Sequence, residues 1–127
     1  AIDETVHLCR NNTGMQLCLA VNYGGRAEIV EATRTLARRV ADGLLQPDEI
    51  DERSIEAHLE TNGMPDPDLL IRTAGEMRLS NFLLWQMSYA EFWVTPDLWP
   101  DFTENHLDEA LAAFQSRERR FGGLSST

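Results

Sequence analysis

A short apolar run that ends abruptly in an arginine constrains the fold of this chain more than any other feature. Leu69 to Ile71 follow Pro65 and Pro67, and Arg72 and Gly75 come directly after them. An apolar run of this length, bounded by proline and glycine, is typical of a buried strand. Because a buried strand needs both faces covered, the run predicts an α/β sheet with helices packed on it.

Two more apolar runs and the patterns between them extend this prediction. Residues 16–22 are almost continuously apolar and are predicted to form a strand, as are residues 91–95 before Pro96. Helical spacing predicts helices in five segments, near residues 2–12, 26–42, 51–59 and 81–89 and from a cap at Asp101 or Thr103 to about residue 120. Strands that alternate with helices indicate a parallel or mostly parallel sheet flanked by helices.

The start of the chain gives an expectation about its extent. The first helical pattern has no start signal before it, and the chain begins at Ala1 without a methionine. Three strands also make a thin sheet. We therefore expect residues 1–127 to be part of a single, incomplete domain. A native terminus from which the methionine has been removed is the alternative.

Charge and cysteine content limit the partners. The formal net charge of −10 argues against a nucleic-acid-binding surface, although a local group of arginines can still bind a small anion. Cys9 and Cys18 are the only cysteines, without metal-type spacing. They are expected to be reduced thiols of a cytosolic protein, a disulfide between them being the alternative. No apolar run reaches the roughly 20 residues of a membrane span.

The strongest candidate site consists of Arg72, Arg78 and Ser80. Arg72 stands at the carboxyl end of a predicted strand, where ligands bind in open α/β sheets. Two guanidinium groups and a hydroxyl suit a phosphate or diphosphate. The alternative is a structural arginine that ties this loop to Glu76 or Glu91.

Each of the other candidate binding residues also has a structural alternative. Glu91 begins a predicted strand and could give Mg²⁺ one oxygen, or it could be ion-paired or solvated. The glycines of residues 22–26 allow a tight turn or a close approach to a ligand. Arg117 to Arg120 favour the end of a helix, or they contact a second anion.

The remaining notable side chains are expected to have structural positions. The three histidines lie on predicted helices and are interpreted as surface residues. The aromatic residues between positions 85 and 99 are expected in the core or in a dimer interface.

Together these blocks resemble the cis-prenyltransferase family, and most closely the undecaprenyl diphosphate synthases of bacteria. The matching segments are Asn22-Tyr-Gly-Gly-Arg26, Asp68-Leu-Leu-Ile-Arg-Thr73, Gly75-Glu76, Arg78-Leu-Ser-Asn-Phe-Leu-Leu-Trp-Gln86, Tyr89-Ala-Glu91, Leu98-Trp-Pro-Asp-Phe102 and Arg117-Glu-Arg-Arg-Phe-Gly-Gly123. They keep the order and approximate spacing of the family and cover nearly the whole chain.

The resemblance implies an enzyme that adds isopentenyl diphosphate, with cis geometry, to an allylic diphosphate such as farnesyl diphosphate. By position, Arg72, Arg78 and Ser80 would hold the diphosphate of isopentenyl diphosphate, and Glu91 would help to place Mg²⁺. Arg120 and Gly122 would belong to the Arg-x-Gly motif that reaches the partner's substrate site in a homodimer. The resemblance also implies a cytoplasmic enzyme of isoprenoid biosynthesis that makes the lipid carrier of the cell wall and contacts the membrane through its lipid product.

Two departures qualify the resemblance. Position 77 is Met, where the family often has a polar residue. The Asp-Gly-Asn-Gly-Arg phosphate loop of the family, which carries its essential aspartate, does not occur in this sequence. The chain therefore resembles the C-terminal half of the enzyme, contains no catalytic residue of its own, and is expected to be inactive alone.

Two other interpretations remain open from the sequence. The chain could be a non-catalytic cis-prenyltransferase-like subunit that lends its C-terminal arginine segment to another chain. It could also be an unrelated α/β phosphate-binding domain. Retention of Arg72, Arg78, Ser80 and Glu91 together favours the enzyme, because a helper subunit has no need of its own substrate site.

Overall fold

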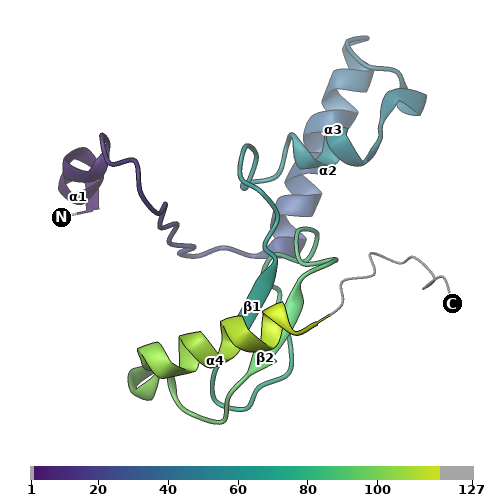
Figure 1. Cartoon of the computed structure of the whole chain (residues 1–127). Coiled ribbons are helices and arrows are strands. Elements are labelled where there is room, and N and C mark those ends of the chain that lie inside the picture. The colour runs from purple at the N-terminus through teal and green to yellow at the C-terminus, as the bar shows by residue number, and fades with distance from the viewer. Residues whose placement is uncertain (1, 118–127) are drawn as a thin grey trace, which may run out of the picture.

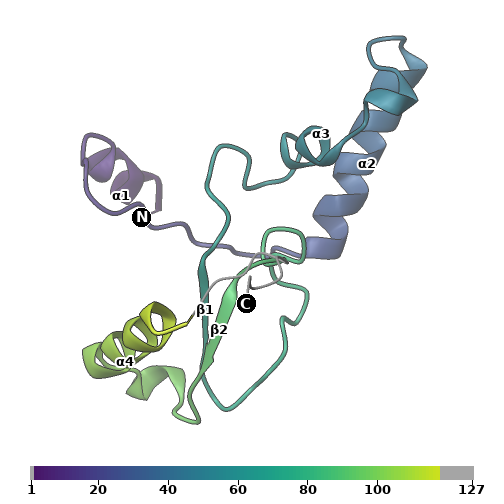
Figure 2. The same cartoon turned by 45° about the vertical axis from the view of Figure 1, so that its right-hand side comes forward.

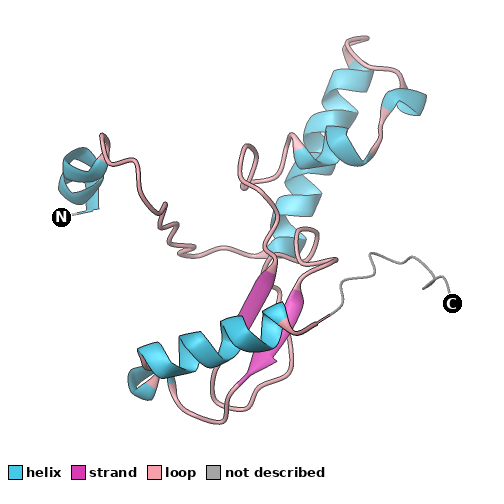
Figure 3. Cartoon of the chain, in the orientation of Figure 1, coloured by secondary structure: helices cyan, strands magenta, loops and turns pink. Residues whose placement is uncertain are grey.

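The computed structural model describes residues 2–117 (Figure 1). Its elements in chain order are α1 (Ile2–Cys9), α2 (Gly25–Ala41), the 3₁₀ turn η1 (Pro47–Glu49), α3 (Glu52–Glu56), β1 (Leu69–Arg72), β2 (Glu91–Val94), the 3₁₀ turn η2 (Trp99–Asp101) and α4 (Glu104–Gln115). Figure 3 shows how much of the chain between these elements is loop. Within residues 2–117, no helix has the length and apolar character that crossing a membrane requires.

The sheet is parallel, as the sequence predicts, and in the described residues it has two strands. β1 pairs with β2 in the register Leu69 to Glu91 and Arg72 to Val94. The main chain continues the pairing past the strands, since Thr95 N donates to Arg72 O at 2.9 Å. In Figure 2 α4 lies beside this pair of strands, whereas in Figure 1 it passes in front of them, and it packs against β2. The α/β class with a parallel sheet and flanking helices is therefore confirmed.

The strand predicted over residues 16–22 is not formed. The segment is extended but joins no sheet, and it leads from α1 to the start of α2 (Figure 1). Its alternate apolar side chains are exposed, with Leu17 at 74%, Leu19 at 70% and Val21 at 80%. The apolar pattern indicates only that these side chains favour burial. A strand also needs a neighbouring strand that pairs with its backbone N–H and C=O groups. Among residues 2–117, β1 and β2 pair with each other and not with this segment.

The glycines before α2 are required by close packing. Gly25 is buried, and its N–H donates to Asn81 O at 2.8 Å. A Cβ on Gly25 would lie 3.0 Å from Leu84 Cγ and 3.2 Å from Asn81 O. The Asn81 side chain also caps the helix, because its Oδ1 accepts from Arg26 N at 2.9 Å. The structural interpretation of these glycines is therefore the one that the contacts favour.

The same contacts explain why the helix predicted over residues 81–89 is absent. Ser80, Asn81 and Leu83 have φ angles of 51°, 65° and 46°, in the left-handed region. A right-handed helix cannot include such residues. The segment forms successive turns instead, and these place Asn81 on α2 and bury Gln86 and Met87.

Local capping residues correctly predicted where α3 and α4 begin. Asp51 and Ser54 form a reciprocal capping box at α3, with Ser54 N donating to Asp51 Oδ1 at 2.8 Å. Thr103, one of two predicted caps, begins α4, where His106 accepts its backbone N–H at 2.9 Å. His106, interpreted from the sequence as a surface residue, is half-buried, caps the helix and lies 3.2 Å from Asp97.

The core is small, and only some of the apolar residues of the helices lie in it. On α4, Ala110 is fully buried while Leu107 and Leu111 remain partly exposed. On α2, Ala32 and Leu36 are buried with Glu28, while Thr33 is exposed. Among the aromatic residues, Tyr89 and Trp99 are exposed rather than in the core. Cys9 and Cys18 are free and exposed, so the alternative of a disulfide is wrong.

Replacing Gly25 by Ala in the full-length gene product should lower its free energy of unfolding by about 1–3 kcal/mol. The added methyl would press on the backbone of residues 81–84, and overpacking of a close contact costs about that much. Urea unfolding measures the loss. Gly14→Ala is the matched control, because nothing lies within 4 Å of its Cβ position. Equal urea midpoints for the two variants would contradict this account of the junction.

Candidate functional site

The candidate site begins where β1 ends. Arg72 is the last residue of β1, and its side chain is 25% exposed. The loop after β1 is anchored to the loop after β2, because Ala74 N donates to Asp97 O at 2.7 Å and Gly75 N to Thr95 O at 2.8 Å. These contacts fix where the chain turns after Arg72. They place its guanidinium at the carboxyl edge of the sheet, where the sequence predicted it.

The structure brings Arg72, Arg78 and Ser80 together. Arg78 Nε donates to Ser80 Oγ at 3.1 Å, and Arg72 Nη2 donates to the same hydroxyl oxygen at 3.4 Å. Glu76 lies between the two arginines and accepts from Nη2 of each. Both guanidinium groups therefore point to one place, which already holds an anionic carboxylate.

Glu76 shows how strongly this place favours negative charge. The hydrogen bond from Arg72 holds the pKa of the Glu76 carboxyl below its ordinary value, and the charge of Arg78 acts in the same direction. Within residues 2–117, the contacts of Arg72 use only its Nη2 atom. A guanidinium has five N–H donors, so Nε and Nη1 remain available to an incoming anion. A diphosphate could bind there beside Glu76 or displace it.

The backbone of the site loop is strained, which also favours a functional role. Five residues between positions 74 and 83 have positive φ, and four of them are not glycine: Ala74, Ser80, Asn81 and Leu83. Such residues are costly and gather where a ligand site imposes the conformation. Here the strain turns Ser80 toward the arginines and Asn81 toward α2. Asn81 is a positioning residue that the sequence analysis missed, although Asn tolerates this conformation and commonly caps helices.

Glu91 lies apart from this cluster. It starts β2 at the level of Leu69, three residues before the level of Arg72, which is about 10 Å along a strand. Its carboxylate accepts from Arg117 Nη1 at 2.6 Å. Glu91 and Arg72 therefore stand at opposite ends of the paired strands. Arg117 sits just past α4, and its contact is an ion pair with Glu91.

The residues present do not form a metal centre by themselves. Within residues 2–117, no three Asp, Glu, His or Cys side chains are placed to share one ion. Glu91 offers a single carboxylate, and Mg²⁺ in proteins commonly takes one or two carboxylates together with phosphate oxygens and water. Glu91 fits Mg²⁺ only as one ligand of several. Arg120 and Gly122, the other predicted binding residues, lie outside the described residues.

Comparison with known proteins extends across nearly the whole chain. The family model described as "Putative undecaprenyl diphosphate synthase" matches residues 1–122. An isoprenyl transferase of Geobacillus kaustophilus is 54% identical over 126 residues, which are 99% of this chain and 49% of the relative. Dehydrodolichyl diphosphate synthase 2 of Arabidopsis thaliana is 53% identical over 98% of this chain and 41% of its own length.

A solved structure agrees in fold as well as in sequence. The crystal structure of lavandulyl diphosphate synthase from Lavandula x intermedia, in complex with dimethylallyl diphosphate, superposes with a TM-score of 0.89 at 54% identity. The match covers 95% of this chain and 52% of the solved chain. The chain thus spans about half the length of the relatives it matches.

Proposed function

This chain belongs to the undecaprenyl diphosphate synthase family, and from that premise we propose that it is the C-terminal part of a cis-prenyl chain-elongating transferase. The reaction joins isopentenyl diphosphate to an allylic diphosphate and releases the diphosphate of the allylic substrate and one proton of isopentenyl diphosphate. The arrangement that carries the proposal is the convergence of Arg72 and Arg78 on Ser80 and Glu76. The dimethylallyl diphosphate bound by the solved relative supports an allylic diphosphate as one substrate.

The arginine cluster would hold the diphosphate of isopentenyl diphosphate. Fixed guanidinium forks bind phosphate oxygens in pairs, which sets the direction of the attached carbon chain as well as its distance. Holding two substrates in line removes much of the entropic barrier to their condensation. Ser80 would add one hydroxyl contact and keep both arginines in position. The positions of these side chains support an anion site, and the assignment to isopentenyl diphosphate rests on the family.

The full-length gene product should incorporate labelled isopentenyl diphosphate into a longer, organic-extractable lipid when farnesyl diphosphate and Mg²⁺ are supplied. This assay tests the proposed function and separates it from the second interpretation, a non-catalytic partner subunit. A partner subunit would be inactive alone and would raise the turnover of a second chain. A full-length product that shows neither behaviour would contradict both.

Glu91 would supply one carboxylate to the Mg²⁺ that also binds diphosphate. Glu91→Gln should then move the Mg²⁺ activation curve of the full-length enzyme to higher concentration, since the amide carries no charge. Arg117→Gln is the matched variant, because it removes the ion partner of Glu91 and leaves the carboxylate in place. It should leave the curve in place or shift it to lower concentration. An unchanged curve for Glu91→Gln with activity lost would indicate that Glu91 serves the Arg117 ion pair.

We also propose that the enzyme is a cytoplasmic homodimer, contacting the membrane through its lipid product, in which Arg120 and Gly122 reach the partner's substrate site. The half-exposed aromatic residues Trp85, Phe92 and Trp93 and the exposed Tyr89 suit such an interface. Sedimentation of the full-length enzyme as a monomer at assay concentrations would contradict the dimer.

A further inference from the structure

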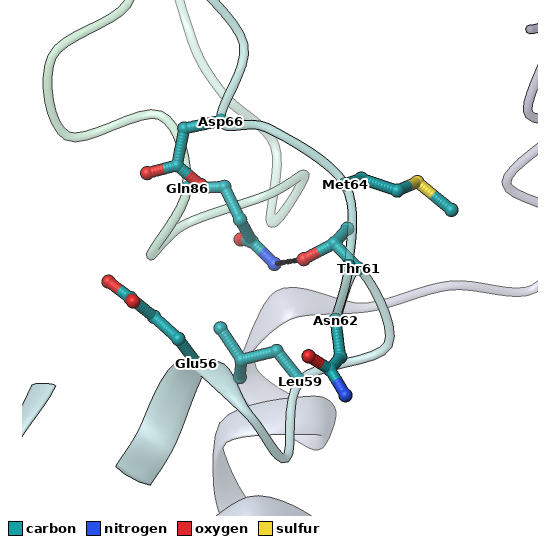
Figure 4. A pocket seen from close by; sticks show the side chains of 8 residues that line it. Glu56, Leu59, Thr61, Asn62, Met64, Asp66 and Gln86 are labelled. Carbon is teal, nitrogen blue, oxygen red and sulfur yellow. Dashed lines mark hydrogen bonds between the residues drawn. The ribbon is translucent and has the colours of Figure 1, made fainter. Parts of the chain in front are cut away.

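A separate pocket of about 300 Å³ lies between α3, the turn after it and the turn segment that follows the arginine loop (Figure 4). Its polar lining includes Glu56, Thr61, Asp66 and Gln86. The residues that line it do not include Arg72, Arg78 or Ser80, so it is not part of the proposed diphosphate site. Its chemistry is also the opposite, because it presents oxygen acceptors instead of guanidinium donors.

Gln86 is the buried centre of this pocket. The residue is 2% exposed, and its Nε2 donates to Thr61 Oγ1 at 2.8 Å and to Glu28 Oε1 at 3.1 Å. Glu28 is itself 3% exposed and accepts from the Tyr23 hydroxyl and from Glu60 N as well. Three donors thus converge on the Glu28 carboxylate. The amide of Gln86 must therefore present its NH₂ group to Glu28, and its oxygen is directed elsewhere.

The amide oxygen of Gln86 is an unsatisfied hydrogen-bond acceptor within the described residues. Oε1 is buried and has no hydrogen-bond partner among the described residues. Figure 4 shows it turned away from Thr61, toward the side of the pocket where the carboxylates of Glu56 and Asp66 lie. A buried acceptor without a donor is costly, and native proteins rarely leave one. The pocket therefore calls for a ligand that donates hydrogen bonds.

The acidic lining of the pocket indicates which kind of hydrogen-bond donor would bind there. Glu56 and Asp66 both line it, Glu28 lies behind Gln86, and none of the lining residues is basic. Burial raises the pKa of the Asp66 carboxyl, and the charge of Glu56 raises it further. Both effects oppose a negative charge on Asp66 beside that of Glu56. A cationic donor would relieve this repulsion and pair the Gln86 oxygen at once.

A metal ion is a poorer candidate than an organic cation. No three Asp, Glu, His or Cys side chains in residues 2–117 are grouped closely enough to hold one. A guanidinium group carries five N–H donors that point outward in a plane, so it can reach acceptors that are spread around a cavity. We propose that this pocket binds a guanidinium group, with Gln86 Oε1 and the carboxylates of Glu56 and Asp66 as its acceptors. The group could belong to a small free molecule or to an arginine side chain of another protein.

The test is a titration of the full-length gene product with methylguanidinium chloride, followed by the ¹⁵N–¹H signals of the Gln86 side-chain amide. Saturable shifts of these signals are expected. A second titration uses a capped Gly-Arg-Gly peptide. Tighter binding of the peptide than of methylguanidinium would indicate an arginine side chain as the natural ligand, and the reverse order would indicate a small free molecule. Tetramethylammonium has the same charge and no N–H group, so it should cause no saturable shift.

The matched variant is the double substitution Glu56→Gln and Asp66→Asn, which keeps the shapes of both side chains. It should weaken methylguanidinium binding by about tenfold or more, as expected for charge-assisted hydrogen bonds. Glu52→Gln, on the same helix but not in the pocket lining, should leave binding unchanged. Arg72→Lys should also leave it unchanged, which separates this proposal from the diphosphate site.

Four results would overturn the proposal, three of them from the titrations with organic cations. They are the absence of any saturable shift, equal responses to methylguanidinium and tetramethylammonium, and full binding by the double variant. Competition by Mg²⁺ at far lower concentration than methylguanidinium would also overturn it and indicate a metal site.

Discussion

The 127-residue chain alone should show no prenyl transfer at all, whereas the full-length gene product should turn over. Condensation requires two diphosphates held side by side. The described residues bring one pair of arginines to one place, and the phosphate-loop string Asp-Gly-Asn-Gly-Arg is absent from the sequence. The measurement is incorporation of labelled isopentenyl diphosphate with farnesyl diphosphate and Mg²⁺.

The fold gives a second reason to expect this inactivity. A condensation between hydrocarbon substrates needs an enclosed, water-poor pocket. In this chain the apolar side chains of Met15, Leu17, Leu19 and Val21 are exposed along a segment that pairs with neither β1 nor β2. We propose that a further segment of the full-length protein covers them, so that the pocket forms only there.

The control for this experiment is the folded state of the isolated chain. Circular dichroism should show helix, so that inactivity is not merely unfolding. Turnover by the isolated chain at a rate near that of the full-length product would contradict both the missing-loop argument and the proposed division of the domain.

Much of the fold was predictable because its signals are local. β1 follows two prolines and ends at Arg72, and α3 carries its own capping box of Asp51 and Ser54. The site cluster was predictable for the same reason. Arg72, Arg78 and Ser80 lie within nine positions of one another, and a single turn brings them together.

The features that the sequence missed depend on contacts between distant residues. The turns at residues 80–83 are set by Asn81 binding the start of α2, 55 positions earlier. The apolar content of that segment resembles a helix, so its pattern alone could not show the left-handed residues. Glu91 pairs with Arg117 across 26 positions, and no local signal indicates which cation a lone carboxylate meets.

In the full-length enzyme, Arg72→Lys should raise the KM for isopentenyl diphosphate by about ten- to a hundredfold. Lysine keeps the charge but loses the planar fork, so it cannot hold Ser80, Glu76 and a diphosphate oxygen together. Loss of one charge-assisted hydrogen bond costs roughly 1.5–3 kcal/mol, which corresponds to that range. The KM for farnesyl diphosphate should change far less. Steady-state kinetics with each substrate varied in turn measures both.

In the structural alternative, Arg72 only ties the loop to the Glu76 carboxylate. A substitution of Glu76 tests this alternative. Under that alternative, Glu76→Gln should reproduce the effects of Arg72→Lys, because each variant weakens the same pair. If Arg72 binds diphosphate, Glu76→Gln should instead keep or lower the KM for isopentenyl diphosphate, since a competing anion has been removed. Arg34→Lys, which alters an exposed ion pair on α2, controls for the general effect of the substitution.

The free energy of unfolding also separates a ligand-binding role of Arg72 from a structural one. The Arg72–Glu76 pair is partly exposed, so breaking it should cost at most about 1 kcal/mol of unfolding free energy. A large rise in KM with little loss of stability therefore indicates a ligand-binding arginine. An unchanged KM, or equal rises for Arg72→Lys and Glu76→Gln together with destabilisation, would show that Arg72 serves the loop and that the diphosphate binds elsewhere.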